Sequence, residues 1–103
     1  MANFVYIYHG GKMPETPEEG ERVMGLWMSW LGGMGDAVVD GGNPVGMSRT
    51  VFAGRVEDNG GSNPTSGYSI VSAESIDQAV EMAKGCPILA EDGSVEVAEI
   101  MQM

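Results

Sequence analysis

The sequence is poor in the residues on which much protein chemistry depends. It has 1 cysteine (Cys86) and 1 histidine (His9), and its 5 Lys and Arg are set against 15 Asp and Glu, for a net charge of -10. One cysteine cannot form an internal disulfide, which fits a reducing cytoplasm. One histidine and one cysteine cannot supply three nitrogen or sulfur ligands, so we expect no metal site of that kind within one chain. The acidic charge repels phosphate backbones and anionic lipid surfaces, so we expect neither nucleic acid nor a membrane as a partner.

Long hydrophobic runs and nucleotide-binding motifs are also missing. The apolar run from Phe4 to Tyr8 is too short for the core of a signal peptide, and no stretch has the length of a membrane span. No Gly-x-Gly-x-x-Gly, Walker or Gly-x-Ser-x-Gly sequence occurs. We therefore expect a cytoplasmic protein without a cofactor.

The apolar pattern and the helix-boundary residues predict two helices. Thr16 is placed as an N-cap, Pro17 as the first helical residue and Glu19 as the partner that completes a capping box. An apolar stripe that includes Trp27 and Trp30 then continues to a glycine cluster, so the first helix is predicted over 17–31. The second is predicted to begin after Ser75 and to stop at Gly85.

Four stretches read as strands of one sheet: 3–8, 36–40, 68–72 and 94–101. A hairpin or loop insert at about 46–66 ends in a turn-rich loop, 58–66. The order strand, helix, strand, strand, helix, strand predicts a single α+β domain over residues 1–103. Its expected architecture is ferredoxin-like (βαββαβ), an antiparallel sheet with both helices on one face.

The first strand is apolar on both faces, with Phe4, Tyr6 and Tyr8 on one and Val5 and Ile7 on the other. Two helices cover only one face of a sheet, so the other face needs a cover. A second copy of the sheet would supply it, and we therefore expect a homodimer.

The C-terminal third resembles the YCII-related (DGPF-type) domain family. The resemblance rests on Gly67-Tyr68-Ser69-Ile70-Val71, Ser75-Ile76-Asp77-Gln78-Ala79-Val80, Ala83-Lys84-Gly85-Cys86-Pro87 and Gly93-Ser94-Val95-Glu96-Val97, and it covers about 3–10, 17–42 and 67–101. It implies a dimeric α+β barrel built from ferredoxin-like protomers. Some members have been suggested to be enzymes that use a His and Asp pair in a cleft. The first helix here contains no histidine, and Asp58-Asn59-Gly60-Gly61 stands nearest to the Asp-Gly-Pro-Phe signature.

His9 and Asp40 are the candidate catalytic residues. A histidine titrates near neutral pH and suits a general base, and His9 is followed by two glycines that let a ligand approach the backbone. In the predicted topology the C-terminal ends of the first two strands lie at the same end of the sheet. We therefore expect Asp40 to lie near His9 and orient its ring. The other interpretation is that His9 is a loop histidine held by backbone groups.

Trp27, Trp30 and Cys86 are the candidate ligand-binding residues. The two tryptophans would form the apolar wall of a cleft, although their spacing also fits a core stripe. Cys86 follows the predicted end of a helix, where the dipole disfavours a thiolate, so a buried structural thiol is its other interpretation.

Two functions remain open. The first is a homodimeric module with a cleft for a small organic ligand. An anionic group on that ligand would bind close to a helix N-terminus. The alternative is a cofactor-independent enzyme, a lyase or isomerase that transfers a proton with His9 as the base. Whether the protein is an enzyme is left open by the sequence.

Overall fold

The computed structural model describes residues 1–58 and 63–102, so part of the expected 58–66 loop lies outside the described residues. Its elements in chain order are β1 (Ala2–His9), α1 (Pro17–Met34), the 3-10 helix η1 (Gly35–Ala37), β2 (Val38–Pro44), β3 (Arg49–Phe52), β4 (Arg55–Asp58), β5 (Thr65–Ala73), α2 (Ile76–Ala83), the 3-10 helix η2 (Pro87–Glu91) and β6 (Ser94–Glu99).

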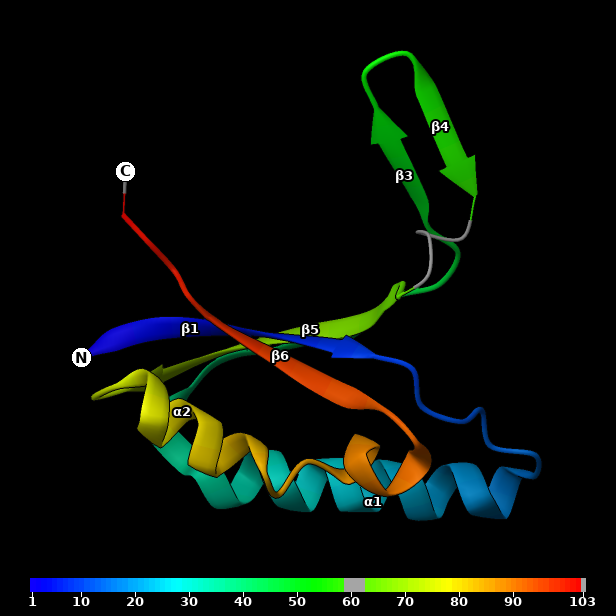
Figure 1. Ribbon diagram of the computed structural model, residues 1–103. Helices are drawn as coiled ribbons and strands as arrows, with labels where there is room; N and C mark the ends of the chain where they lie inside the picture. Colours follow the sequence, from blue (N-terminus) through cyan, green and yellow to red (C-terminus); the bar gives the residue numbers. More distant parts are fainter. Residues whose placement is uncertain (59–62, 103) are drawn as a thin grey trace.

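Four strands form one antiparallel sheet in the order β2-β5-β1-β6. Both helices lie on the same side of it, and β1 and β5 are the central strands (Figure 1). This is the ferredoxin-like arrangement, so the predicted fold is confirmed. The remaining strands, β3 and β4, pair with each other in a separate hairpin.

The core lies between the helices and the sheet because β1 alternates its side chains. Phe4, Tyr6 and Tyr8 are buried on the helix face, and the Tyr6 hydroxyl donates to the Ala79 carbonyl of α2 at 2.6 Å. Val5 and Ile7, on the other face, are only half-buried. We call this second side, which no helix among the described residues covers, the open face (Figure 1).

The first helix begins as predicted and ends later. Thr16 accepts the Glu19 N–H at 3.1 Å, as the capping box requires. The helix then continues through Gly32 and Gly33 to Met34, which packs against the core. Each glycine costs a helix about 1 kcal/mol relative to alanine, and the contact of Met34 outweighs that local preference.

The prediction for the second strand is wrong in both bounds, because 36–37 form a 3-10 turn and pairing continues to Pro44. β2 crosses its glycine pair as a bulged edge strand, with register shifts against β5 on both sides of Asp40. Asp40 stabilises the bulge, since its Oδ1 accepts the Gly42 N–H at 2.8 Å. At the other edge, β6 ends at Glu99, two residues before the predicted end.

The strands β3 and β4 form a hairpin within the expected insert. In Figure 1 it rises from the sheet on the side away from the helices. Its apolar side chains Val51, Phe52 and Val56 are exposed, and the Arg55 guanidinium stacks 4.2 Å from the centre of the Phe52 ring. Within this chain the hairpin therefore leaves apolar surface in water.

Replacing Gly42 tests the bulge. Its φ is +72°, and a Cβ there would meet the Tyr68 carbonyl oxygen at 1.7 Å, so backbone would have to move. We expect Gly42→Ala to lower the free energy of unfolding by about 3 kcal/mol or more, because a clash adds to the backbone strain. Gly54→Ala is the matched control: its φ is +90° but nothing lies within 4 Å of the added Cβ. Denaturant unfolding of both variants checks this, and equal losses would show that the clash is relieved.

Candidate functional site

A cavity of about 440 Å³ lies between α1, from Gly20 to Leu31, and the end of the sheet where β1 and β2 finish and β5 begins. We call it the α1 cavity. Its walls are mostly apolar side chains and glycine backbone, and its volume falls within the roughly 300–1,000 Å³ of small-ligand sites. Its principal apolar side chains are Tyr8, Val23, Met24, Trp27, Leu31 and Ile88. The cavity is thus a mainly apolar space lined by five elements of the fold, β1, α1, β2, β5 and η2.

A buried chain of hydrogen bonds fixes the sheet side of the α1 cavity. The Tyr8 hydroxyl donates to Ser69 Oγ at 2.7 Å, and Ser69 Oγ donates to the Gly41 carbonyl at 2.6 Å. Burial raises the pKa of Tyr8 far above its usual value, so the hydroxyl keeps its proton. Strands β1, β5 and β2 are held together at this point.

The charged groups at the α1 cavity are already paired with others in the chain. Lys12 contacts Asp92 at 3.3 Å, and Glu91 contacts Arg22 at 3.8 Å. Such partly exposed pairs add little stability, but each leaves its lining charge with an opposite charge beside it. The cavity therefore has no marked preference for one sign of charge.

His9 lies on the open face and is not among the residues that line the α1 cavity. Its Nδ1 donates to the carbonyls of Asn63 and Pro64 at 3.1 and 3.2 Å, and its Nε2 lies 3.0 Å from Glu96 Oε1. The residue is only 9% exposed. Both ring nitrogens face acceptor oxygens, so in this arrangement neither is free to take a proton from a substrate.

The structure does not bring Asp40 to His9, and that part of the sequence-based prediction is wrong. Asp40 lies opposite Ile70, and Ile70 lies opposite Val5, two strands across and four residues along from His9. With strands about 4.8 Å apart and about 3.4 Å per residue, their Cα atoms are separated by roughly 17 Å. The carboxylate near His9 is that of Glu96, and Asp40 instead caps Gly42.

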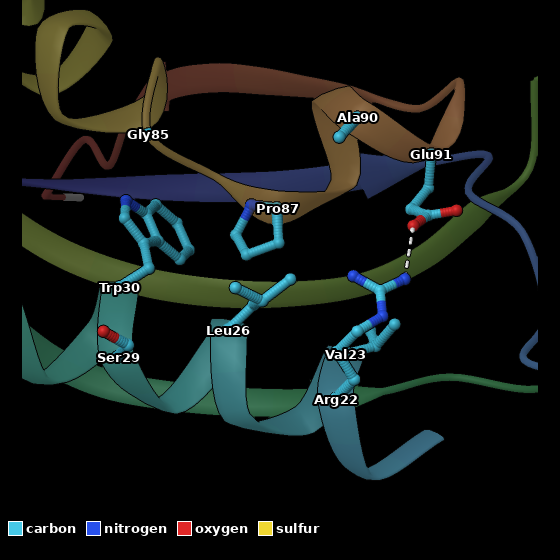
Figure 2. Close-up of a pocket in the computed structure, with 9 residues that line it drawn as sticks. All are labelled: Arg22, Val23, Leu26, Ser29, Trp30, Gly85, Pro87, Ala90 and Glu91. Carbon is cyan, nitrogen blue, oxygen red and sulfur yellow. Dashed lines mark ion pairs between the residues drawn. The ribbon is translucent and has the colours of Figure 1, made fainter. Parts of the chain in front are cut away.

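The two tryptophans line different cavities. Trp27 lines the α1 cavity and meets the Tyr8 ring edge-on, with 4.8 Å between ring centres. Trp30 lines a second cavity of about 340 Å³ between α1 and η2, where Leu26 and Pro87 face each other and an Arg22–Glu91 pair lies at one end (Figure 2). The Trp30 indole N–H donates to the Met82 carbonyl at 3.0 Å, so this side chain also ties α1 to α2.

Cys86 lines neither cavity, so the structure does not support its expected contact with a ligand. It is 3% exposed and belongs to the core. Burial raises the pKa of its thiol to about 11, which keeps it protonated at neutral pH. Its other interpretation, a buried structural thiol, fits this environment.

Several residues of the α1 cavity carry no motif that sequence reasoning could have used. Ser66 and Gly20 are absent from the predicted site, and Met13 and Met24 line the cavity from a loop and a helix. Within residues 1–58 and 63–102 no three His, Cys, Asp or Glu side chains are grouped to hold a metal ion. Among the same residues, no helix combines the length and apolar character that crossing a bilayer requires.

The buried ionisable core predicts a loss of stability at high pH. Burial raises the pKa of Cys86 from 9.0 to about 11 and that of Tyr6 from 10.0 to about 12. Below pH 9 both states hold these protons, but at higher pH the unfolded chain loses protons that the folded chain keeps. We therefore expect the free energy of unfolding to fall between about pH 9 and 12, by up to about 1.4 kcal/mol per pH unit for each group.

Denaturant unfolding between pH 8 and 11 measures this, with Cys86→Ala and Tyr6→Phe as variants that each lack one of the two groups. Each variant should lose stability less steeply with pH than the unmodified chain. A stability that stays level or rises over this range would contradict the prediction.

Comparison with known proteins agrees with this architecture. No curated protein matches the sequence. The sequence model of the YCII-related domain family matches residues 15–103, from the loop before α1 to the end of the chain, and confirms the resemblance seen in the C-terminal third. The match includes both helices and every strand except β1. The chain therefore belongs to the YCII-related domain family.

Proposed function

We propose that the protein is a cytoplasmic homodimeric module that binds a small organic ligand in the α1 cavity. The observation that carries the proposal is the cavity itself: about 440 Å³, mainly apolar, and braced on its sheet side by the Tyr8–Ser69–Gly41 hydrogen bonds. Because these hydrogen bonds already order the wall, less conformational entropy would be lost when a ligand binds. The anionic group expected from the sequence is not part of this proposal, because Lys12 in the lining already pairs with Asp92.

The open face supports the homodimer. Val5, Ile7, Tyr68 and Ile70 lie side by side on it and are half-buried in the single chain. The β3–β4 hairpin, whose apolar side chains are exposed, rises on the same side of the sheet (Figure 1). A second copy related by a twofold axis would cover both surfaces with matching apolar ones.

The alternative, a proton-transferring enzyme with His9 as its base, has less support. The ring lies on the face opposite the α1 cavity, and both of its nitrogens contact acceptor oxygens. A general base has to be within hydrogen-bond reach of the proton that it removes. Catalysis by His9 would need both a second cleft on the open face and release of the Glu96 contact.

Ligand binding is tested with a metabolite library and two matched variants. Trp27→Phe shortens a side chain that lines the α1 cavity. Trp30→Phe makes the same change at a neighbouring tryptophan that does not line it. For a compound that raises the melting temperature, we expect Trp27→Phe to weaken binding by about tenfold, which corresponds to about 1.4 kcal/mol. Trp30→Phe should leave affinity within about twofold while costing a similar amount of stability. Dissociation constants from calorimetry check this, and equal effects of the two variants would contradict it.

The homodimer is tested by light scattering. We expect a mass twice the 10.9 kDa of one chain, and we expect Ile70→Asp to give monomers because it places a charge in the centre of the open face. Leu26→Asp is the control, since Leu26 is 46% exposed on α1 and lies on the helix side of the sheet. A monomeric unmodified protein at micromolar concentration, or dissociation by both variants, would contradict the dimer.

A further inference from the structure

We propose that the α1 cavity takes an uncharged aromatic molecule that carries one hydrogen-bonding group. Ser66 is the residue that would form a hydrogen bond with that group. Gly20 and Gly41, which have no side chains, keep the cavity large enough for the ligand. The inference rests on the proposed ligand-binding function and adds to it the chemical class of the ligand.

The aromatic preference follows from the walls. Tyr8 and Trp27 meet edge to face, and a further ring in the cavity would continue such offset or edge-on contacts, which stabilise aromatic pairs beyond the area that they bury. Met13 and Met24 also line the cavity and are 86% and 61% exposed, so they stand at its open side. Thioether sulfurs make favourable contacts with aromatic rings and adapt to different shapes.

The preference for an uncharged molecule follows from the charges. The lining contains one cation and one anion, Lys12 and Glu91, and each has an opposite charge within 4 Å from outside the lining. A ligand charge would lose its hydration in an apolar space, and the lining charge that could pair with it already has an opposite charge beside it. The net charge of -10 adds a general repulsion of anions.

The hydrogen-bonding group follows from Ser66. This residue lines the α1 cavity, and its Oγ is buried with no hydrogen-bond partner among the described residues. A buried hydroxyl without a partner is costly and uncommon, and rotation of the serine side chain toward the cavity would let a ligand supply that partner. Ser66 is the extra residue where the β1–β5 register shifts, between Thr65 opposite His9 and Gly67 opposite Tyr8.

Two glycines set the size of the α1 cavity, and the backbone conformation at their positions does not require glycine. Neither Gly20 nor Gly41 has a positive φ, and a Cβ on each would make only ordinary contacts, with Pro14 at 3.7 Å and with Leu31 at 3.9 Å. Both line the cavity, and Gly20 lies inside a helix, where alanine would be more stable. Their lack of side chains keeps the space open.

The first experiment compares ligands that share one shape. Calorimetric titration at neutral pH uses naphthol, naphthoate, naphthylmethylammonium and decahydronaphthol. We expect naphthol to bind at least about tenfold more tightly than each of the others, which lack either neutrality or aromatic rings. Equal affinity for naphthoate or naphthylmethylammonium would overturn the uncharged class, and equal affinity for decahydronaphthol would overturn the aromatic one.

The second experiment assigns the polar contact. Ser66→Ala should weaken naphthol by about threefold to tenfold, the usual value of one hydrogen bond, and leave naphthalene unchanged. The variant should be at least as stable as the unmodified chain, because the hydroxyl that it removes has no described partner. An equal effect on both compounds, or none on either, would overturn the assignment of Ser66.

The third experiment separates this inference from the function on which it rests. Gly20→Leu should abolish naphthol binding, whereas Gly25→Leu on the same helix should not, because Gly25 is outside the lining and nothing lies within 4 Å of its added Cβ. If naphthol fails to bind but a library compound binds and is blocked by Gly20→Leu, the ligand class is wrong and the α1 cavity remains the site. If Gly20→Leu blocks no bound compound, both the inference and the proposed function are wrong.

Discussion

The hydrogen bonds from Tyr8 through Ser69 to the Gly41 carbonyl are the constraint on which the candidate site depends. They join β1, β5 and the edge strand β2, whose register shifts twice and which would otherwise be held there only by irregular pairing. Removing the central hydroxyl would leave a buried donor and a carbonyl without their partner, and each such group costs about 1–3 kcal/mol. Tyr8 therefore has two roles, since its ring is a wall of the α1 cavity and its hydroxyl braces the strand opposite.

The alternation of β1 places two neighbouring residues on opposite faces of the sheet. Tyr8 faces the helices and the α1 cavity, whereas His9 faces the open side, where Glu96 and the carbonyls of Asn63 and Pro64 hold its ring. Successive side chains of a strand point to opposite faces. The sequence-based site combines His9 with tryptophans of α1, and these residues lie on opposite faces of the sheet. The imidazole instead joins the start of β5 to β6 on the face proposed for the dimer contact.

The fold was predictable because its signals are local. The capping box at Thr16, the Ser75 cap and the two apolar faces of β1 specify elements whose order leaves few topologies. The bulge at Gly42 was not predictable in this way, because a Gly-Gly-Asn-Pro run is typical of a chain break and only Asp40 and the neighbouring strand make it a paired one. The α1 cavity depends on contacts between residues 61 positions apart, such as Tyr8 and Ser69, and no spacing in the sequence encodes them.

The first helix shows how the proposed ligand binding would be coupled to the stability of the fold. The 18 residues of α1 include none that is fully buried, whereas the 8 residues of α2 bury Ala79 and Ala83. The side of α1 that lines the α1 cavity runs from Gly20 to Leu31 and contacts Tyr8 through Trp27, whereas Trp30 packs against Tyr6 and donates to the Met82 carbonyl. A molecule in the α1 cavity would add contacts to this lining side of the helix. Because such a molecule binds only the folded chain, it would stabilise the protein in proportion to the logarithm of its concentration, and the gain would be localised in α1.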